Sequence, residues 1–199
     1  MTGPILLTGF QPFGVHAVNP TMLLMDRLAG MEGVVTAILP VEYDRCGIVF
    51  ADLLDRHKPV AALCFGLSYR TDSVLIERRA WNRDETEQAD NAGVVRTDSV
   101  IVEGAPTSYG CGLPESLLER ALAGAGVPVG FSDHAGGFVC NHLYYRARHT
   151  IETRGITVPM AFIHVPPLPE QATDRVGGLA IERLEAGARA LVGAVLQRL

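Results

Sequence analysis

Blocks of apolar residues along this chain alternate between two patterns. Short runs that are apolar throughout are typical of strands buried on both faces of a sheet. Longer stretches with an apolar residue at every third or fourth position are typical of amphipathic helices. The predicted strands are residues 4–10, 34–41, 60–66, 127–132 and 157–167, and residues 73–82 are expected to be extended. The predicted helices are residues 21–30, 44–58, 113–126, 140–149 and 173–199.

This alternation of strands and helices predicts an α/β domain whose sheet is covered on both faces. No linker or repeat interrupts the pattern, so we expect one domain over residues 1–199. Residues 82–112 are polar and rich in glycine, and they allow no clear prediction. Sites in such folds gather beyond the carboxyl ends of strands. The loops after Thr8, Phe131 and Ile163 are therefore the expected place for a site.

Composition narrows the functional classes. The 199 residues include 48% hydrophobic and 20% charged residues, which predicts a folded core. The formal net charge of −5 argues against a nucleic-acid partner. No apolar run is long enough to span a bilayer, and no basic residue precedes Arg27, so we expect a cytoplasmic protein. The single lysine, Lys58, follows no glycine-rich loop, which argues against a phosphate-binding P-loop.

The cysteines are the first candidates for chemistry. Cys46, Cys64, Cys111 and Cys140 lack zinc-site spacing, so we expect free thiols and no metal. Cys140 differs from the others because it falls in the first turn of a predicted helix, where the helix dipole favours a thiolate. The Ala-Gly-Gly segment before it, which includes Gly136 and Gly137, offers backbone amides to an oxyanion. Taken alone, the position of Cys140 slightly favours a buried structural cysteine over a nucleophile.

A nucleophilic thiol needs a base, and His164 is the strongest candidate because it ends an apolar strand at the expected edge. His142 and His149 fall on other helix faces and are interpreted as surface or helix-end residues. The remaining histidines are weaker candidates: His134 in a turn, and His16 and His57, which are expected to be solvated.

Glu77 is an acid within an otherwise apolar extended run, beside Arg78 and Arg79. A buried carboxylate is costly unless it is paired. Glu77 either forms an ion pair with one of these arginines or orients the base.

Four segments, in this order, resemble one known family. They are "LLTGFQPFGVHAVNPT", "IERRAWN" (followed by "ADN" at residues 89–91), "AGGFVCNHLYY" and "FIHVPPLPEQ", between residues 5 and 171. Together they resemble the pyroglutamyl peptidase I family of cysteine peptidases, also called pyrrolidone-carboxylate peptidases. The resemblance implies a three-layer α/β/α sandwich with a mostly parallel or mixed central sheet.

The same resemblance implies a catalytic triad of Cys140, His164 and Glu77. It implies removal of N-terminal pyroglutamate from small peptides through a thioester, without a cofactor or metal. It also implies a cytosolic homo-oligomer, either a tetramer or a dimer. The pyrrolidone ring is expected to lie against Phe10 and Phe13. Asn19 is expected to supply or organise polar contacts.

Several residues depart from the family's pattern around the expected pocket. Where the family commonly has G-Q-A-G-G-R, this chain has "GLSYRT", so Leu67 replaces a glutamine that often binds the lactam. Tyr69 stands where a small residue is expected, and Arg70 lies one place before the family's arginine. Gly137 replaces the usual threonine, and Leu75 and Arg79 break the glutamate motif. Two alternatives therefore stay open: a diverged thiol amidase for another small cyclic or N-acyl amide, and a ligand-binding relative without turnover.

Overall fold

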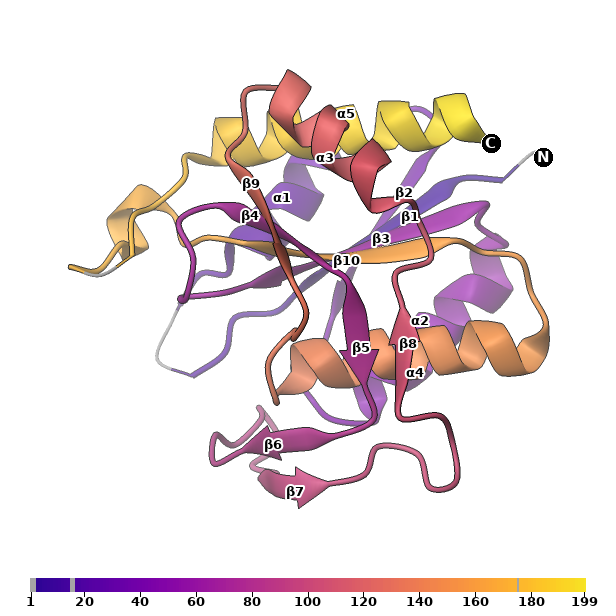
Figure 1. Ribbon diagram of the computed structural model, residues 1–199. Helices are drawn as coiled ribbons and strands as arrows, with labels where there is room; N and C mark the ends of the chain where they lie inside the picture. Colours follow the sequence, from indigo (N-terminus) through magenta and orange to yellow (C-terminus); the bar gives the residue numbers. More distant parts are fainter. Residues whose placement is uncertain (1–2, 15–16, 175) are drawn as a thin grey trace.

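The computed structural model describes residues 3–14, 17–174 and 176–199. A mixed sheet of six strands forms its centre, in the order β2-β1-β3-β10-β4-β9 (Figure 1). The strands are β1 (Ile5–Phe10), β2 (Val34–Leu39), β3 (Ala61–Leu67), β4 (Val74–Glu77), β9 (Val129–Ser132) and β10 (Met160–Val165). Strands β2, β1, β3 and β10 run parallel, whereas β4 is antiparallel to β10 and β9 is parallel to β4.

Helices cover both faces of this sheet, as Figure 1 shows. Helices α1 (Pro20–Leu28), α3 (Glu115–Gly124) and α5 (Ile181–Arg198) lie on one face, and α2 (Arg45–His57) and α4 (Val139–Arg154) lie on the other. Alternate residues of each strand enter the two cores: Leu7 and Ile163 pack under α1 and α5, and Leu6 and Phe162 pack under α2 and α4. Every residue of β1, β3 and β10 is buried, which explains why these strands are apolar at nearly every position. The predicted three-layer α/β/α architecture is confirmed.

Residues 82–112, which gave no clear prediction, form most of two small antiparallel sheets. Strand β5 (Arg79–Trp81) pairs with β8 (Ser108–Gly110), and β6 (Asp84–Thr86) pairs with β7 (Arg96–Ser99). The β6–β7 hairpin lies next to the first turns of α4 (Figure 1). Its sequence is polar because most of its side chains are exposed, so it carries no strong strand pattern.

Two predicted helix boundaries are wrong. The last helix begins at Ile181 rather than Thr173, and the chain before it packs closely on Pro169, where a Cβ on Gly178 would lie 2.5 Å from backbone. The helix that starts near Cys140 runs on to Arg154 and is ended by Gly155 in a left-handed conformation. The segment 73–82 is extended as expected, over β4 up to Glu77 and over β5 from Arg79.

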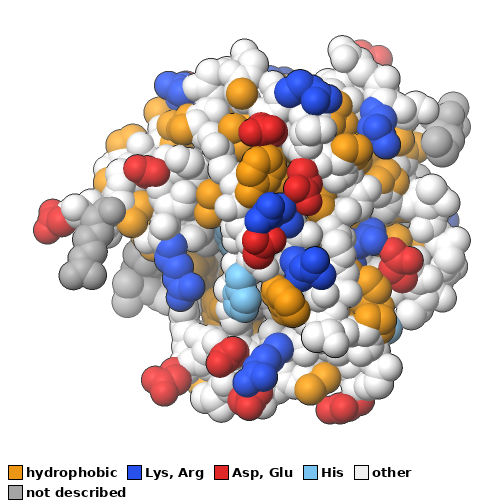
Figure 2. Space-filling view, viewed as in Figure 1, with side chains coloured by type: hydrophobic (Ala, Val, Ile, Leu, Met, Phe, Trp, Pro, Cys, Tyr) orange, Lys and Arg blue, Asp and Glu red, His pale blue; other side chains and the backbone are white. Residues whose placement is uncertain are grey.

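Charged side chains of both signs intermingle on the face shown in Figure 2. One ion pair between exposed side chains joins Arg78 and Asp133. Within the described residues, every helix falls short of a transmembrane span in length or hydropathy. In the same part of the chain, no group of three or more His, Cys, Asp or Glu side chains is arranged to hold a metal ion.

Candidate active site

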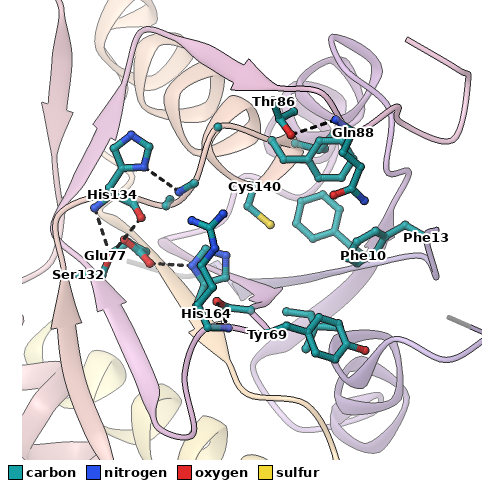
Figure 3. A pocket seen from close by; sticks show the side chains of 18 of the residues that line it. Phe10, Phe13, Tyr69, Glu77, Thr86, Gln88, Ser132, His134, Cys140 and His164 are labelled. Atoms are coloured by element: carbon teal, nitrogen blue, oxygen red, sulfur yellow. Dashed lines mark hydrogen bonds and ion pairs between the residues drawn. The ribbon is translucent and has the colours of Figure 1, made fainter. Parts of the chain in front are cut away.

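A cavity of about 320 Å³ opens where β1, β3 and β10 end, which is the edge that the sequence predicted. Figure 3 shows the side chains around it. The structure gathers there every site residue singled out from the sequence. These are Phe10, Phe13, Asn19, Leu67, Arg70, Glu77, Gly136, Gly137, Cys140 and His164.

Strand register brings His164 to Glu77. In the antiparallel pair of β4 and β10, Glu77 lies opposite Phe162, two residues before His164. Residues two apart on a strand share a face, so Glu77 and His164 are diagonal neighbours. His164 Nδ1 lies 2.7 Å from Glu77 Oε1, and the two side chains are 7% and 1% exposed. The expected contact between the acid and the imidazole is confirmed.

The protonated form of His164 is strongly favoured. Burial lowers the pKa of His164, but hydrogen bonds with Cys140 and Glu77 raise it more, to about 10 from the ordinary 6.5. One nitrogen of the imidazolium donates to the Glu77 carboxylate, which leaves the other for the sulfur. At neutral pH the site therefore holds a proton on His164 that can be passed to a reacting group.

Cys140 lies at the start of α4, and a glycine of the sheet makes room for its sulfur. Gly66 on β3 is the register partner of His164 on β10. A Cβ built on Gly66 would lie 2.9 Å from Cys140 Sγ and 2.9 Å from the ring of Phe162. The sulfur thus packs on bare backbone one strand away from His164, and adjacent strands are only about 4.8 Å apart.

The comparisons with known proteins agree with this geometry. The family model described as pyroglutamyl peptidase matches residues 4–198. The chain belongs to the pyroglutamyl peptidase family. A pyrrolidone-carboxylate peptidase from Bacillus licheniformis is 35% identical over 200 residues, covering 98% of this chain and 92% of its own. One from Pyrococcus furiosus is 36% identical over 177 residues, covering 87% and 85%.

Solved structures of pyroglutamyl peptidases share the whole fold. The crystal structure of pyroglutamyl peptidase I from Bacillus amyloliquefaciens superimposes with a TM-score of 0.93 at 29% identity, over 98% of this chain and 95% of that one. A pyrrolidone carboxyl peptidase mutant from P. furiosus superimposes with a TM-score of 0.92 at 30% identity, over 98% and 99%. The protein is thus a cysteine hydrolase of the pyroglutamyl-peptidase I type.

The glycine under the sulfur gives a first prediction for this pyroglutamyl peptidase. Gly66→Ala should lower kcat/KM about 10- to 100-fold, because the new methyl group pushes the nucleophile away from His164. Overpacking against Phe162 should also cost about 1–3 kcal/mol of unfolding free energy. Steady-state kinetics and urea denaturation measure the two effects. Gly193→Ala, where a Cβ meets nothing within 4 Å, is the matched control, and equal effects of both substitutions would contradict the account.

The Gly-Gly segment requires one correction. Gly136 has a φ of +84°, and its N–H donates to His134 Nδ1 at 3.1 Å, so that amide is not free to stabilise an oxyanion. The Gly137 carbonyl accepts from Glu85 N at 2.9 Å, and a Cβ at Gly137 would lie 2.1 Å from the Glu85 carbonyl oxygen. The β6–β7 hairpin thus occupies the space that a threonine at position 137 would need. The first-turn amides of α4, including that of Cys140, lack intrahelical acceptors and remain as candidate donors.

The start of α4 is fastened to the small sheets by Asn141, which the sequence analysis missed. Its Oδ1 accepts from Trp81 N at 2.9 Å, and its Nδ2 donates to Trp81 O at 2.9 Å and Arg83 O at 2.8 Å. One turn after Cys140, the Tyr144 hydroxyl donates to Glu77 O at 3.1 Å. These bonds set the helix that carries the thiol against the strand that carries the carboxylate. The signal available in the sequence was the polar Asn141 directly after the cysteine.

The interpretation of His142 as a surface residue is wrong. His142 is fully buried, its Nδ1 lies 2.7 Å from Asp84 Oδ2, and its Nε2 accepts from Asp44 N at 3.1 Å. The physical reason is that the β6–β7 hairpin, which the sequence did not reveal, covers this face of α4. His149 is half-buried, with a ring nitrogen 2.8 Å from the Tyr109 hydroxyl.

Of the three histidines that the sequence analysis rated weak, two lie in the described residues. His134 lines the cavity, and its Nδ1 accepts the Gly136 N–H. His57 is the last residue of α2 and is partly exposed, whereas His16 lies outside the described residues.

Asn19 organises the first loop. Its Oδ1 caps α1 by accepting from Thr21 N at 3.0 Å and from the Thr21 hydroxyl at 2.9 Å, and its Nδ2 donates to Gln11 O at 3.0 Å. Leu67 is buried at the cavity wall, so the wall is apolar at the position where the family often has glutamine. Arg70 is exposed at the same cavity, and its backbone N–H donates to Ser68 Oγ.

Proposed function

We propose that this protein is a cysteine peptidase that removes N-terminal pyroglutamate from peptides through a thioester acyl-enzyme. One observation carries the proposal. Cys140 packs on Gly66 beside the His164–Glu77 pair, in a cavity with aromatic side chains at one end. The pyrrolidone-carboxylate peptidases among its relatives support this substrate.

In the proposed acylation step, His164 already holds the proton taken from the thiol, and the Cys140 sulfur attacks the pyroglutamyl carbonyl carbon as a thiolate. The amides at the start of α4 donate to the resulting oxyanion, and the helix dipole favours the negative charge there. The His164 imidazolium then gives its proton to the leaving amine, and the C–N bond breaks. Glu77 keeps the imidazole oriented and favours its protonated form.

Deacylation uses the same groups, but His164 now acts first as a base and the Cys140 sulfur is the leaving group. Neutral His164 takes a proton from water, and the hydroxide attacks the thioester carbonyl carbon. The C–S bond breaks, pyroglutamate leaves, and the sulfur departs as a thiolate that again faces the His164 imidazolium. Glu77 holds Nδ1 throughout, so Nε2 serves as the atom that exchanges protons with the sulfur, the amine and water.

The cavity has two ends of different character. In Figure 3, Phe10 and Phe13 lie on one side of Cys140, and Ser132 and His134 lie on the other. The aromatic side suits the flat, largely apolar pyrrolidone ring. The peptide leaving group would then extend past the polar side, toward the turn that carries His134.

A panel of coumarin amides tests the function. The purified protein is incubated with pyroglutamyl, prolyl, N-acetylglycyl and cyclopentanecarbonyl coumarin amides, and we expect release of coumarin from the pyroglutamyl compound alone. If the pyroglutamyl compound stays intact while iodoacetamide labels Cys140 selectively, the protein is a thiol amidase for another acyl group. If Cys140 shows no enhanced reactivity either, the protein is a ligand-binding relative.

Three expectations accompany this proposal. We propose that the protein acts in the cytoplasm, on small peptides and without a nucleic-acid or membrane partner. We also propose a homo-oligomer, either a tetramer or a dimer, as the family resemblance implies. Light scattering on the purified protein distinguishes these assemblies from a monomer, which would overturn the last expectation.

A further inference from the structure

A pyrrolidone ring presents an amide that the acyl end of the cavity must recognise, and the inference below rests on the proposed function. Leu67 is apolar and offers no side-chain hydrogen bond. Asn19 is 1% exposed. Its side-chain oxygen already accepts two hydrogen bonds from Thr21, and its side-chain nitrogen donates one to Gln11 O. Neither of these two side chains therefore offers the lactam both a free donor and a free acceptor.

Gln88 is the exception. It follows β6, lines the cavity, and its backbone N–H donates to Thr86 Oγ1 at 3.1 Å. Among the described residues, no side chain or backbone group forms a hydrogen bond with its side-chain amide. A Cβ placed on Gly14 would have Gln88 Nε2 as its nearest neighbour, at 4.0 Å. Figure 3 shows the Gln88 side chain extending toward the side of the cavity that holds Phe10 and Phe13.

We propose that the Gln88 side-chain amide recognises the lactam of the pyroglutamyl group and so determines acyl specificity. A five-membered lactam is a cis amide, with its N–H and C=O on one edge of the ring. A primary carboxamide also presents an N–H and a C=O side by side. The two groups can therefore form two reciprocal hydrogen bonds, with Gln88 Oε1 accepting from the ring N–H and Nε2 donating to the ring carbonyl.

In this arrangement, two separate segments bind the pyrrolidone ring. The aromatic side chains Phe10 and Phe13 come from β1 and the loop after it, and they contact the ring faces. The β6–β7 hairpin supplies the polar edge through Gln88. In the same hairpin, the Glu85 N–H donates to the Gly137 carbonyl. The segment that would bind the acyl group therefore also supports the loop before Cys140.

Equilibrium binding of ring fragments tests the proposal without turnover. In an NMR titration, Gln88→Leu should weaken binding of 2-pyrrolidinone at least about 10-fold, because a site that pairs with both amide groups rejects a mismatch strongly. Binding of cyclopentanone, which lacks the N–H, should change less than about 2-fold. Gln197→Leu, the same substitution at an exposed position on α5, is the control and should leave both affinities unchanged. Equal weakening of both ligands, or no change in either, would overturn the proposal.

A double substitution tests the same point by kinetics. Leu67→Gln should restore pyroglutamyl kcat/KM at least about 10-fold in the Gln88→Leu background, but should change it less than about 3-fold in the wild type, because one carboxamide satisfies the lactam. Equal gains in both backgrounds would show that Gln88 makes no such contact. If the wild type cleaves no pyroglutamyl amide, the proposed function fails, whereas the titration with 2-pyrrolidinone still decides whether Gln88 binds a lactam.

Discussion

Cys140→Ser should abolish cleavage of a pyroglutamyl coumarin amide, with kcat at least about 10⁴-fold lower than in the wild type. A hydroxyl releases its proton far less readily than a thiol, and the His164 imidazolium is adapted to a sulfur anion. The fold should persist, because oxygen is smaller than sulfur and Gly66 already leaves room at this place. Coumarin fluorescence measures the rate, and thermal unfolding checks the fold.

Cys111→Ser is the matched control for this experiment. Cys111 is a free, partly buried thiol whose Sγ lies 3.9 Å from Met160 O, and it does not line the cavity. Burial raises the pKa of Cys111, which makes it a poor nucleophile. Its variant should keep wild-type kcat/KM within about 3-fold. More than a tenth of the activity left in Cys140→Ser, or its loss in Cys111→Ser, would show that the nucleophile has been misassigned.

Glu77→Gln should lower kcat/KM about 10²- to 10³-fold and change its pH dependence. The glutamine oxygen can still accept from His164 Nδ1, so the ring keeps its orientation while the negative charge is lost. Without that charge, the pKa of His164 falls from about 10 toward its ordinary value. Protonation of the leaving amine needs imidazolium, so the alkaline limb of the kcat/KM profile should move to lower pH by more than one unit.

The free energy of unfolding should decrease as the pH rises and His164 loses its proton. Because the folded-state pKa of His164 lies above its unfolded value, protonation of His164 stabilises the fold. That contribution is complete below about pH 6.5 and is lost as the pH rises toward 10. Urea denaturation at several pH values should therefore show a smaller loss between pH 6.5 and 10 in Glu77→Gln than in the wild type.

Asp133→Asn removes a nearby carboxylate that does not line the cavity, and it serves as the control for Glu77→Gln. Asp133 is exposed and pairs with Arg78, so its loss should leave both the rate and the pH profile unchanged within about 2-fold. If Glu77→Gln keeps the alkaline limb in place, Glu77 does not set the protonation of His164, and the proposed role of the acid is wrong.

The buried strands and their carboxyl ends could be predicted because their signals are local. Strands β1, β3 and β10 are apolar at nearly every position, and burial on both faces produces that pattern wherever it occurs. Asn19 before Pro20 indicated a helix start, and the structure places it as the cap of α1. The position of Cys140 in the first turn of α4 followed from the glycines before it and the helical pattern after it.

The β6–β7 hairpin could not be predicted, and the wrong interpretation of His142 traces to it. It packs on α4 through polar contacts, such as the one between Asp84 and His142, which leave no apolar period in the sequence. Without the hairpin, His142 looks like a surface residue and the Gly137 position looks able to hold threonine. Gln88 drew no attention for the same reason, because its segment was placed in no element.

The sequence by itself determined the main strands and helices, the family and the residue types that chemistry requires, because hydrophobic periods, caps and motif order are properties of neighbouring positions. Only the tertiary structure decided which of these residues meet. Strand order places β3 beside β10 and β10 beside β4, so Gly66, His164 and Glu77 come from three adjacent strands. These contacts join segments up to 98 positions apart, from Gly66 to His164, and pairing at that range depends on the packing of the whole sheet.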